Sequence, residues 1–164
     1  ILAIVEMCKL NIRDFLESIQ SFFNRDLKNI FKVMVVDALR SQGVNFEFNL
    51  TNNGVINKIN PVTSENILES KTYLEIRSIL EDKIGKQNPN LLSLATENLM
   101  LYLSDIYPSK LESNEYNYIA YCIHVYSMEM YGEEVNREEL ALIYKIDTQK
   151  DNKIFNQLQT ACSI

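Results

Sequence analysis

The chain has little of what catalytic and phosphate-binding sites are commonly built from. Its 164 residues include one histidine, no tryptophan, four glycines and three prolines. So few glycines and prolines disfavour a β fold with many tight turns. The sequence also contains no phosphate-binding loop of the GxxxxGK[ST] or GxGxxG type, so we expect no nucleotide site of that kind within it.

Cysteine is scarce as well. Cys8, Cys122 and Cys162 are odd in number and scattered, and no two of them form a C-x-x-C pair. With one histidine and no cysteine pair, a structural zinc site is not expected, and the sequence predicts no bound metal or cofactor. Unpaired thiols are typical of a reducing compartment, which predicts a cytoplasmic location.

Positive charge is in deficit. Sixteen Lys and Arg stand against 22 Asp and Glu, so the net charge is −6. Nucleic-acid backbones are bound by clustered Lys and Arg, and this acidic balance argues against such a partner. No apolar run approaches the roughly 20 residues of a membrane-spanning helix, so no membrane partner is expected. The expected partner is another protein or a further domain of the same protein, and a homo-oligomer stays open.

What the chain does contain is apolar residues at helical spacing. Apolar residues make up 46% of it and charged residues 23%, as in ordinary globular proteins. The pattern predicts a mainly α fold, a bundle of about seven helices with one inserted β-hairpin. The length predicts one domain over residues 1–164. A subdivision into 1–108 and a three-helix unit over 109–164 stays open.

The first helices are predicted from their stripes and ends. Asn11 is expected to cap a helix whose apolar stripe ends at Phe23, and Asn24 is expected to cap the next helix. That second helix should end at Gly43, since glycine adopts a positive φ freely. A third helix is expected to start from a cap at Ser64.

Between the second and third helices the apolar period changes from helical spacing to alternation. Alternating residues predict a β-hairpin over Val44–Ile59, with Asn53-Gly54 as the turn signal. With Thr51–Gly54 as the loop, Glu47 would face Lys58 across the two strands.

The segment Tyr116–Tyr131 is the most continuously apolar helix candidate. It carries the single histidine and five of the nine tyrosines, and Gly132 follows it. A helix that is apolar on most sides is usually surrounded by others. We therefore expect it at the centre, flanked by Asn88–Ile106 and Asn136–Ile146, the latter with Asn136 as its cap and Glu139 as capping-box partner.

At 100° per residue, this helix shows an apolar face and a separate, more polar strip. The apolar face is formed by Tyr116, Ile119, Ile123, Tyr126 and Met130. The strip holds the candidate binding residues Asn117, Tyr121, His124 and Tyr131. His124 is a candidate for a catalytic acid–base group, and this role would need an acid such as Glu97 or Asp105 within hydrogen-bond reach. The simpler interpretation is a hydrogen-bonded structural histidine.

Two further patterns in the sequence bear on function. Glu112-x-x-Glu115 has the spacing with which helical nucleotide hydrolases hold Mg²⁺, but no second acidic pair faces it. The segment Leu10-Asn11-Ile12-Arg13-Asp14 resembles the start of the lid helix of some P-loop ATPases, in which the arginine senses nucleotide. The resemblance covers about five residues and implies a C-terminal regulatory region of a larger ATPase. The start at Ile1, inside an apolar run, also suggests a piece of a longer protein. The alternative is an exposed Arg13 paired with Glu17.

These observations favour a non-catalytic helical module for protein–protein interaction or regulation. They favour it because the acidic, tyrosine-rich chain holds no assembled catalytic set. The alternatives are a small enzyme with a cleft along the Asn117, Tyr121, His124 and Tyr131 strip, and the ATPase regulatory region.

Overall fold

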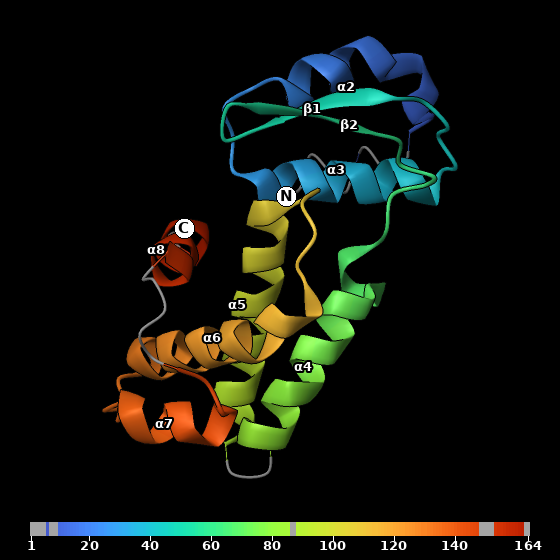
Figure 1. The fold of residues 1–164 in the computed structure, drawn as a ribbon. Coiled ribbons are helices and arrows are strands. Elements are labelled where there is room, and N and C mark those ends of the chain that lie inside the picture. Colours follow the sequence, from blue (N-terminus) through green and yellow to red (C-terminus); the bar gives the residue numbers. More distant parts are fainter. Residues whose placement is uncertain (1–5, 7–9, 86–87, 148–152, 163–164) are drawn as a thin grey trace. The chain divides into compact units, whose positions relative to one another are not determined.

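The structure is a computed structural model, and it describes residue 6 and residues 10–85, 88–147 and 153–162. Over these residues the fold is mainly α, with seven α-helices, three short 3-10 helices and one two-stranded antiparallel hairpin (Figure 1). This confirms the predicted fold class. The chain forms two compact units, residues 1–66 with 104–109 and residues 67–103 with 110–164. The single-domain expectation stays a prediction.

The first unit begins with η1 (Ile12–Phe15) and α2 (Leu16–Phe23), followed by α3 (Asn29–Ser41). Asn11 holds the N-cap position of η1 as predicted, although its side chain makes no capping bond, and the cap predicted at Asn24 is wrong. The N–H of Asn24 bonds to the carbonyl of Gln20, so this residue still belongs to the end of α2. At its other end α3 is followed by the C-cap Gln42 and then by Gly43, whose φ of +61° confirms it as the glycine at which the helix ends.

The hairpin consists of β1 (Phe48–Asn52) and β2 (Val55–Ile59), so the predicted start at Val44 is wrong. Its loop is the two residues Asn53 and Gly54, both with positive φ (48° and 77°), as a type I′ turn requires. The shorter loop shifts the pairing by two residues, so that Asn49 faces Lys58. A shift of two leaves the same side chains facing the core.

The core of this unit joins α2, α3 and the hairpin. Phe23, Phe48 and Leu50 are fully buried, and the Phe23 and Phe48 rings meet edge to face at 5.3 Å. The amine of Lys32 is also buried and donates to the carbonyl of Thr51. Burial lowers the pKa of Lys32 because it disfavours the charged amine.

Two asparagines hold the last turn of α5 (Pro89–Ile106), whose residues from 104 onward belong to the first unit. The side-chain amide of Asn29 donates to the carbonyls of Ser104 and Tyr107, both at 2.8 Å. Asn52 donates to the carbonyl of Asp105 at 2.6 Å. These bonds satisfy carbonyls that a helix end leaves without partners.

The second unit is built around α6 (Tyr116–Tyr131). Its other elements are η2 (Ile67–Glu69), α4 (Lys71–Ile84), most of α5, η3 (Ser113–Glu115), α7 (Arg137–Tyr144) and α8 (Lys153–Cys162). Helix α6 packs against α4, α7 and α8, and a buried bond of 3.0 Å from Asn98 to Ser127 joins it to α5. It ends before Gly132, whose φ is +82°, as predicted.

Of the helix caps predicted for this unit, one is wrong and one is confirmed. Helix α4 is capped by Ser70, whose hydroxyl accepts from the N–H of Tyr73 at 3.1 Å, so the cap predicted at Ser64 is wrong. Ser64 is instead held in the turn after β2, where its hydroxyl donates to Asn60. Asn136 caps α7 as predicted, by accepting from the N–H of Glu139 at 3.2 Å.

Two further observations concern membrane-spanning helices and cysteines. None of the described helices combines the length and the apolar character needed to cross a membrane. Cys122 and Cys162 are buried and are not joined in a disulfide bond, and Cys8 lies outside the described residues.

Candidate functional site

The four residues of the predicted strip do not share one surface. Asn117 is exposed, and Tyr131 is 49% exposed at the end of α6. Tyr121 and His124, between them, are buried at 4% and 7% exposure. Side chains from α7 and α8 meet this middle stretch, which is why the strip is interrupted.

His124 is hydrogen-bonded within this packing. Its Nδ1 lies 2.9 Å from the hydroxyl of Tyr144, whereas Glu97 and Asp105 were the expected partners. Burial lowers the pKa of His124 to about 4 and raises the pKa of Tyr144. Both groups are therefore neutral at neutral pH, where such a weakly basic imidazole accepts protons poorly. An acid–base role for His124 stays a prediction, and these surroundings favour the structural interpretation.

Tyr121 belongs to an aromatic cluster that joins three helices. Its hydroxyl donates to the carbonyl of Arg137 at 3.3 Å, and its ring meets those of Tyr144 and Phe155 edge to face. The guanidinium of Arg137 lies 5.0 Å from the centre of the Phe155 ring and pairs with Glu129 at 2.6 Å. These contacts explain why Tyr121 is buried: it packs between α6, α7 and α8.

The apolar face predicted for α6 is buried from Tyr116 to Ile123, and Ile123 is fully buried. It fails at Met130, which is 51% exposed in the last turn. The face was derived from the helix alone, and nothing in the helix itself shows how far its neighbours extend.

The acidic pair Glu112 and Glu115 has a local structural explanation. The two form a capping box at η3, in which the carboxylate of Glu115 accepts from the N–H of Glu112 at 2.8 Å. In the part of the chain that the structure describes, no three His, Cys, Asp or Glu side chains are grouped so as to hold a metal ion.

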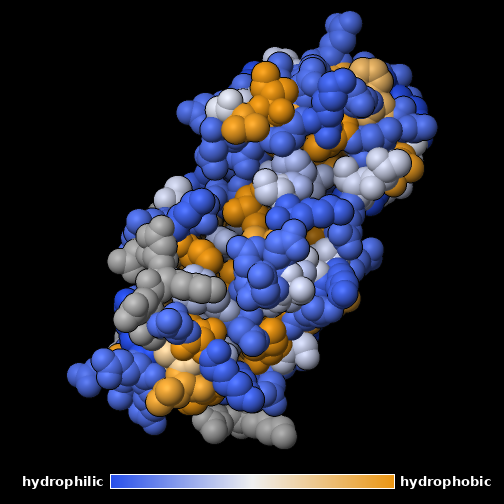
Figure 2. Space-filling view, viewed as in Figure 1, coloured by the Kyte–Doolittle hydropathy of each residue, from blue (hydrophilic) through white to orange (hydrophobic). Residues whose placement is uncertain are grey.

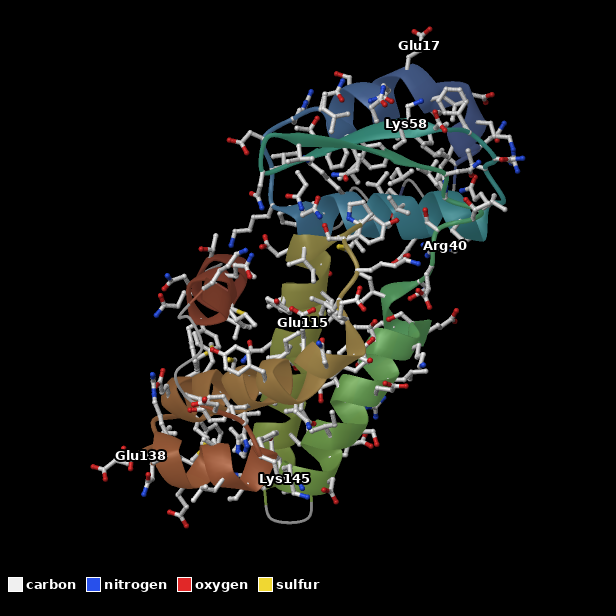
Figure 3. All side chains as sticks on the ribbon, in the orientation of Figure 1. Glu17, Arg40, Lys58, Glu115, Glu138 and Lys145 are labelled. Atoms are coloured by element: carbon white, nitrogen blue, oxygen red, sulfur yellow. The ribbon has the colours of Figure 1, made fainter. Side chains whose placement is uncertain are left out.

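Arg13 is engaged with the end of α3. Its guanidinium donates to the backbone carbonyls of Gln42 and Gly43, and not to Glu17. Glu17 points from α2 into solvent (Figure 3). Arg13 therefore ties the start of the first unit to the helix end that it caps.

The first unit carries a groove that the sequence analysis did not predict. It has a volume of about 790 Å³ and lies between the η1–α2 segment and the residues leading into β1. Its lining residues are Arg13, Asp14, Phe15, Leu16, Glu17, Ser18, Gln20, Phe46, Glu47 and Asn49. We call it the acidic–aromatic groove.

Two aromatic side chains line this groove while half exposed. Phe15 is 50% exposed because the backbone breaks there between η1 and α2, at a φ of −122° and a ψ of 20°. Phe46 is 43% exposed because it precedes the first paired residue of the hairpin, Phe48, against which its ring packs at 4.8 Å. Figure 2 shows apolar side chains at the surface of the first unit among hydrophilic ones.

The remaining lining is mostly acidic or amide-bearing. Asp14, Glu17 and Glu47 contribute carboxylates, and Arg13 is the one cation among the described lining residues. The amide of Gln20 donates to the carbonyl of Asn49 at 2.8 Å and accepts from its N–H at 2.9 Å. This pair of bonds covers the edge of β1 as a neighbouring strand would.

A family model described as "Protein of unknown function (DUF3196)" matches residues 3–157. The chain belongs to this family. The match includes both segments that line the acidic–aromatic groove. Comparisons with curated proteins and with solved structures gave no match.

The second unit has a smaller groove of about 400 Å³ between α4 and α5. Arg77 and Glu81 on its rim pair with each other at 2.8 Å. The rest of the groove is lined by Tyr73, Pro89, Leu92, Ser93, Thr96, Glu97 and Met100. With half the volume and a rim whose arginine is paired, it is the weaker candidate of the two.

Proposed function

We propose that this protein is a non-catalytic protein-binding module and that the acidic–aromatic groove is its docking surface. The observation that carries the proposal is the exposure of Phe15 and Phe46 in one groove. Protein interfaces concentrate their binding energy in a few large side chains that become buried in pockets. Exposed apolar side chains gathered at one place mark such surfaces more often than isolated ones do.

The groove walls are held in place by contacts within the unit. Phe46 packs against Phe48, and Gln20 is bonded to Asn49 on both sides of its amide. Arg13 fixes the start of the opposite wall to the end of α3. A surface ordered before binding loses less conformational entropy when a partner arrives.

The two alternatives have less support. An enzyme with a cleft along the strip would need Tyr121 and His124 accessible, and both are buried. An ATPase lid would need the guanidinium of Arg13 to face nucleotide, and it is bonded to carbonyls of its own unit.

Phe15→Ser should lower partner binding by at least about tenfold, since truncating a central aromatic at an interface costs about 2 kcal/mol or more. The test is quantitative affinity capture from lysate of the cells that make the protein, with the full chain as bait. Leu142→Ser is the matched control, because Leu142 is a 78% exposed apolar residue on α7 in the second unit.

The expected result is a set of captured proteins that Phe15→Ser loses and Leu142→Ser retains. The proposal is wrong if both variants recover the same proteins in the same amounts as the wild-type chain. Circular dichroism of each variant verifies that it is folded.

A further inference from the structure

We infer that the acidic–aromatic groove accepts a protein segment carrying arginine side chains next to aliphatic ones, an inference that rests on the proposed docking function. The inference rests on the charge of the residues that line the groove. Asp14, Glu17 and Glu47 line a groove whose one described cation, Arg13, is bonded to two carbonyls. Because three carboxylates stand against one cation in this lining, an acidic segment or a nucleic acid would meet net repulsion there.

The acids lie on both sides of the groove. Asp14 and Glu17 come from the η1–α2 side, and Glu47 comes from the segment leading into β1. A cationic side chain inserted between these segments therefore meets a carboxylate on either side. Phe15 and Phe46 are the aromatic surface next to them.

A guanidinium fits this combination better than an ammonium does. It is planar, stacks on aromatic rings and donates two parallel hydrogen bonds to a carboxylate. The second unit shows the same combination within this chain, where Arg137 lies over the Phe155 ring and pairs with Glu129. Aliphatic side chains beside the arginine would cover the remaining apolar surface of the two phenylalanines.

Glu47 already pairs with Lys58 at 2.8 Å, and both side chains are mostly exposed. An exposed pair of this kind contributes little to stability, so a partner can share or replace Lys58 at small cost. The groove's volume of about 790 Å³ suits a short segment of a few residues.

The test is fluorescence anisotropy with the full chain and three short labelled peptides of equal length, in which leucine alternates with arginine, glutamate or glutamine. The arginine peptide should bind saturably and one-to-one, and the glutamate peptide should not bind. The double variant Glu17→Lys/Glu47→Lys should weaken binding of the arginine peptide by at least about tenfold, because two attractions become repulsions.

The matched control is Glu134→Lys/Glu138→Lys, which reverses two exposed acids in the second unit; Glu138 projects from α7 into solvent (Figure 3). It should change the affinity less than about twofold, because neither acid lines the groove and exposed charges are screened by salt. Phe15→Ser, at a half-exposed position, is a second groove variant that leaves the charges intact and should also weaken binding.

Three results would overturn the inference. The first is an arginine peptide that fails to bind. The second is a glutamate or glutamine peptide that binds as tightly and is lost in Phe15→Ser; docking in the groove would then stand with a different partner chemistry. The third is an equal loss in both double variants, which would show unspecific attraction to an acidic protein. The docking function itself fails separately, in the capture experiment with Phe15→Ser.

Discussion

Acidification from pH 6.5 to pH 4 should lower the free energy of unfolding by about 3 kcal/mol through His124 alone. The unfolded chain binds a proton at the ordinary histidine pKa of 6.5, whereas burial keeps the folded imidazole neutral down to a pKa of about 4. In this range the unfolded state therefore binds more protons, and stability falls with the pH. The two pKa values differ by about 2.5, and each unit corresponds to 1.36 kcal/mol, which sets a limit of about 3.4 kcal/mol. Somewhat less is reached between pH 6.5 and pH 4, because the histidine is half-protonated in the unfolded state at the first pH and in the folded state at the second.

The measurement is urea unfolding of wild type and His124→Gln at steps from neutral pH to pH 4. Other groups, the carboxylates above all, also titrate near the acid end, so the difference between the two proteins isolates the histidine. Glutamine stays neutral and keeps a hydrogen-bonding group near Tyr144, and the variant should lose less stability on acidification. Parallel pH profiles for both proteins would show that His124 titrates normally and is not desolvated.

Phe48→Ala should cost about 3–5 kcal/mol, the usual range for removing a buried phenylalanine ring. Phe48 is fully buried and meets the Phe23 ring at 5.3 Å and the Phe46 ring at 4.8 Å, both edge to face. Its loss removes the transfer free energy of the ring, opens a cavity and ends both aromatic contacts. A loss of this size approaches the whole stability of a small domain.

Denaturant titration measures this cost, with Phe46→Ala as the control. Phe46 is 43% exposed, so its truncation should cost clearly less than that of Phe48. Phe48→Leu, which keeps most of the apolar volume, gives a folded protein in which the support of the groove wall is loosened. If the two alanine variants lost equal amounts of unfolding free energy, Phe48 would not be the buried residue that supports Phe46.

Helix α6 shows where sequence reasoning succeeds. Its bounds, Tyr116–Tyr131, were predicted correctly because Gly132 ends it locally, through a positive φ that few other residues adopt. The hairpin was also predicted, but its register was displaced by two residues. Alternation and the Asn53-Gly54 turn are compatible with a two-residue or a four-residue loop, and the type I′ turn selected the shorter one.

The site could be predicted much less well, because it depends on what covers each surface. The strip on α6 was derived from angles around an isolated helix, and side chains of α7 and α8 then bury Tyr121 and His124. The groove combines residues near 15 with residues near 46, which only tertiary structure brings together. The local signal for it was an acid beside an aromatic residue, in Asp14-Phe15 and in Phe46-Glu47.

Binding of an arginine-bearing segment in the acidic–aromatic groove can be followed residue by residue. The most direct measurement is an NMR titration of the ¹⁵N-labelled full chain with the arginine–leucine peptide. We expect saturable shifts that are confined to the amides of residues 13–20 and 46–49 and are absent in Phe15→Ser. Shifts centred on α6 or α7, or none that saturate, would contradict it.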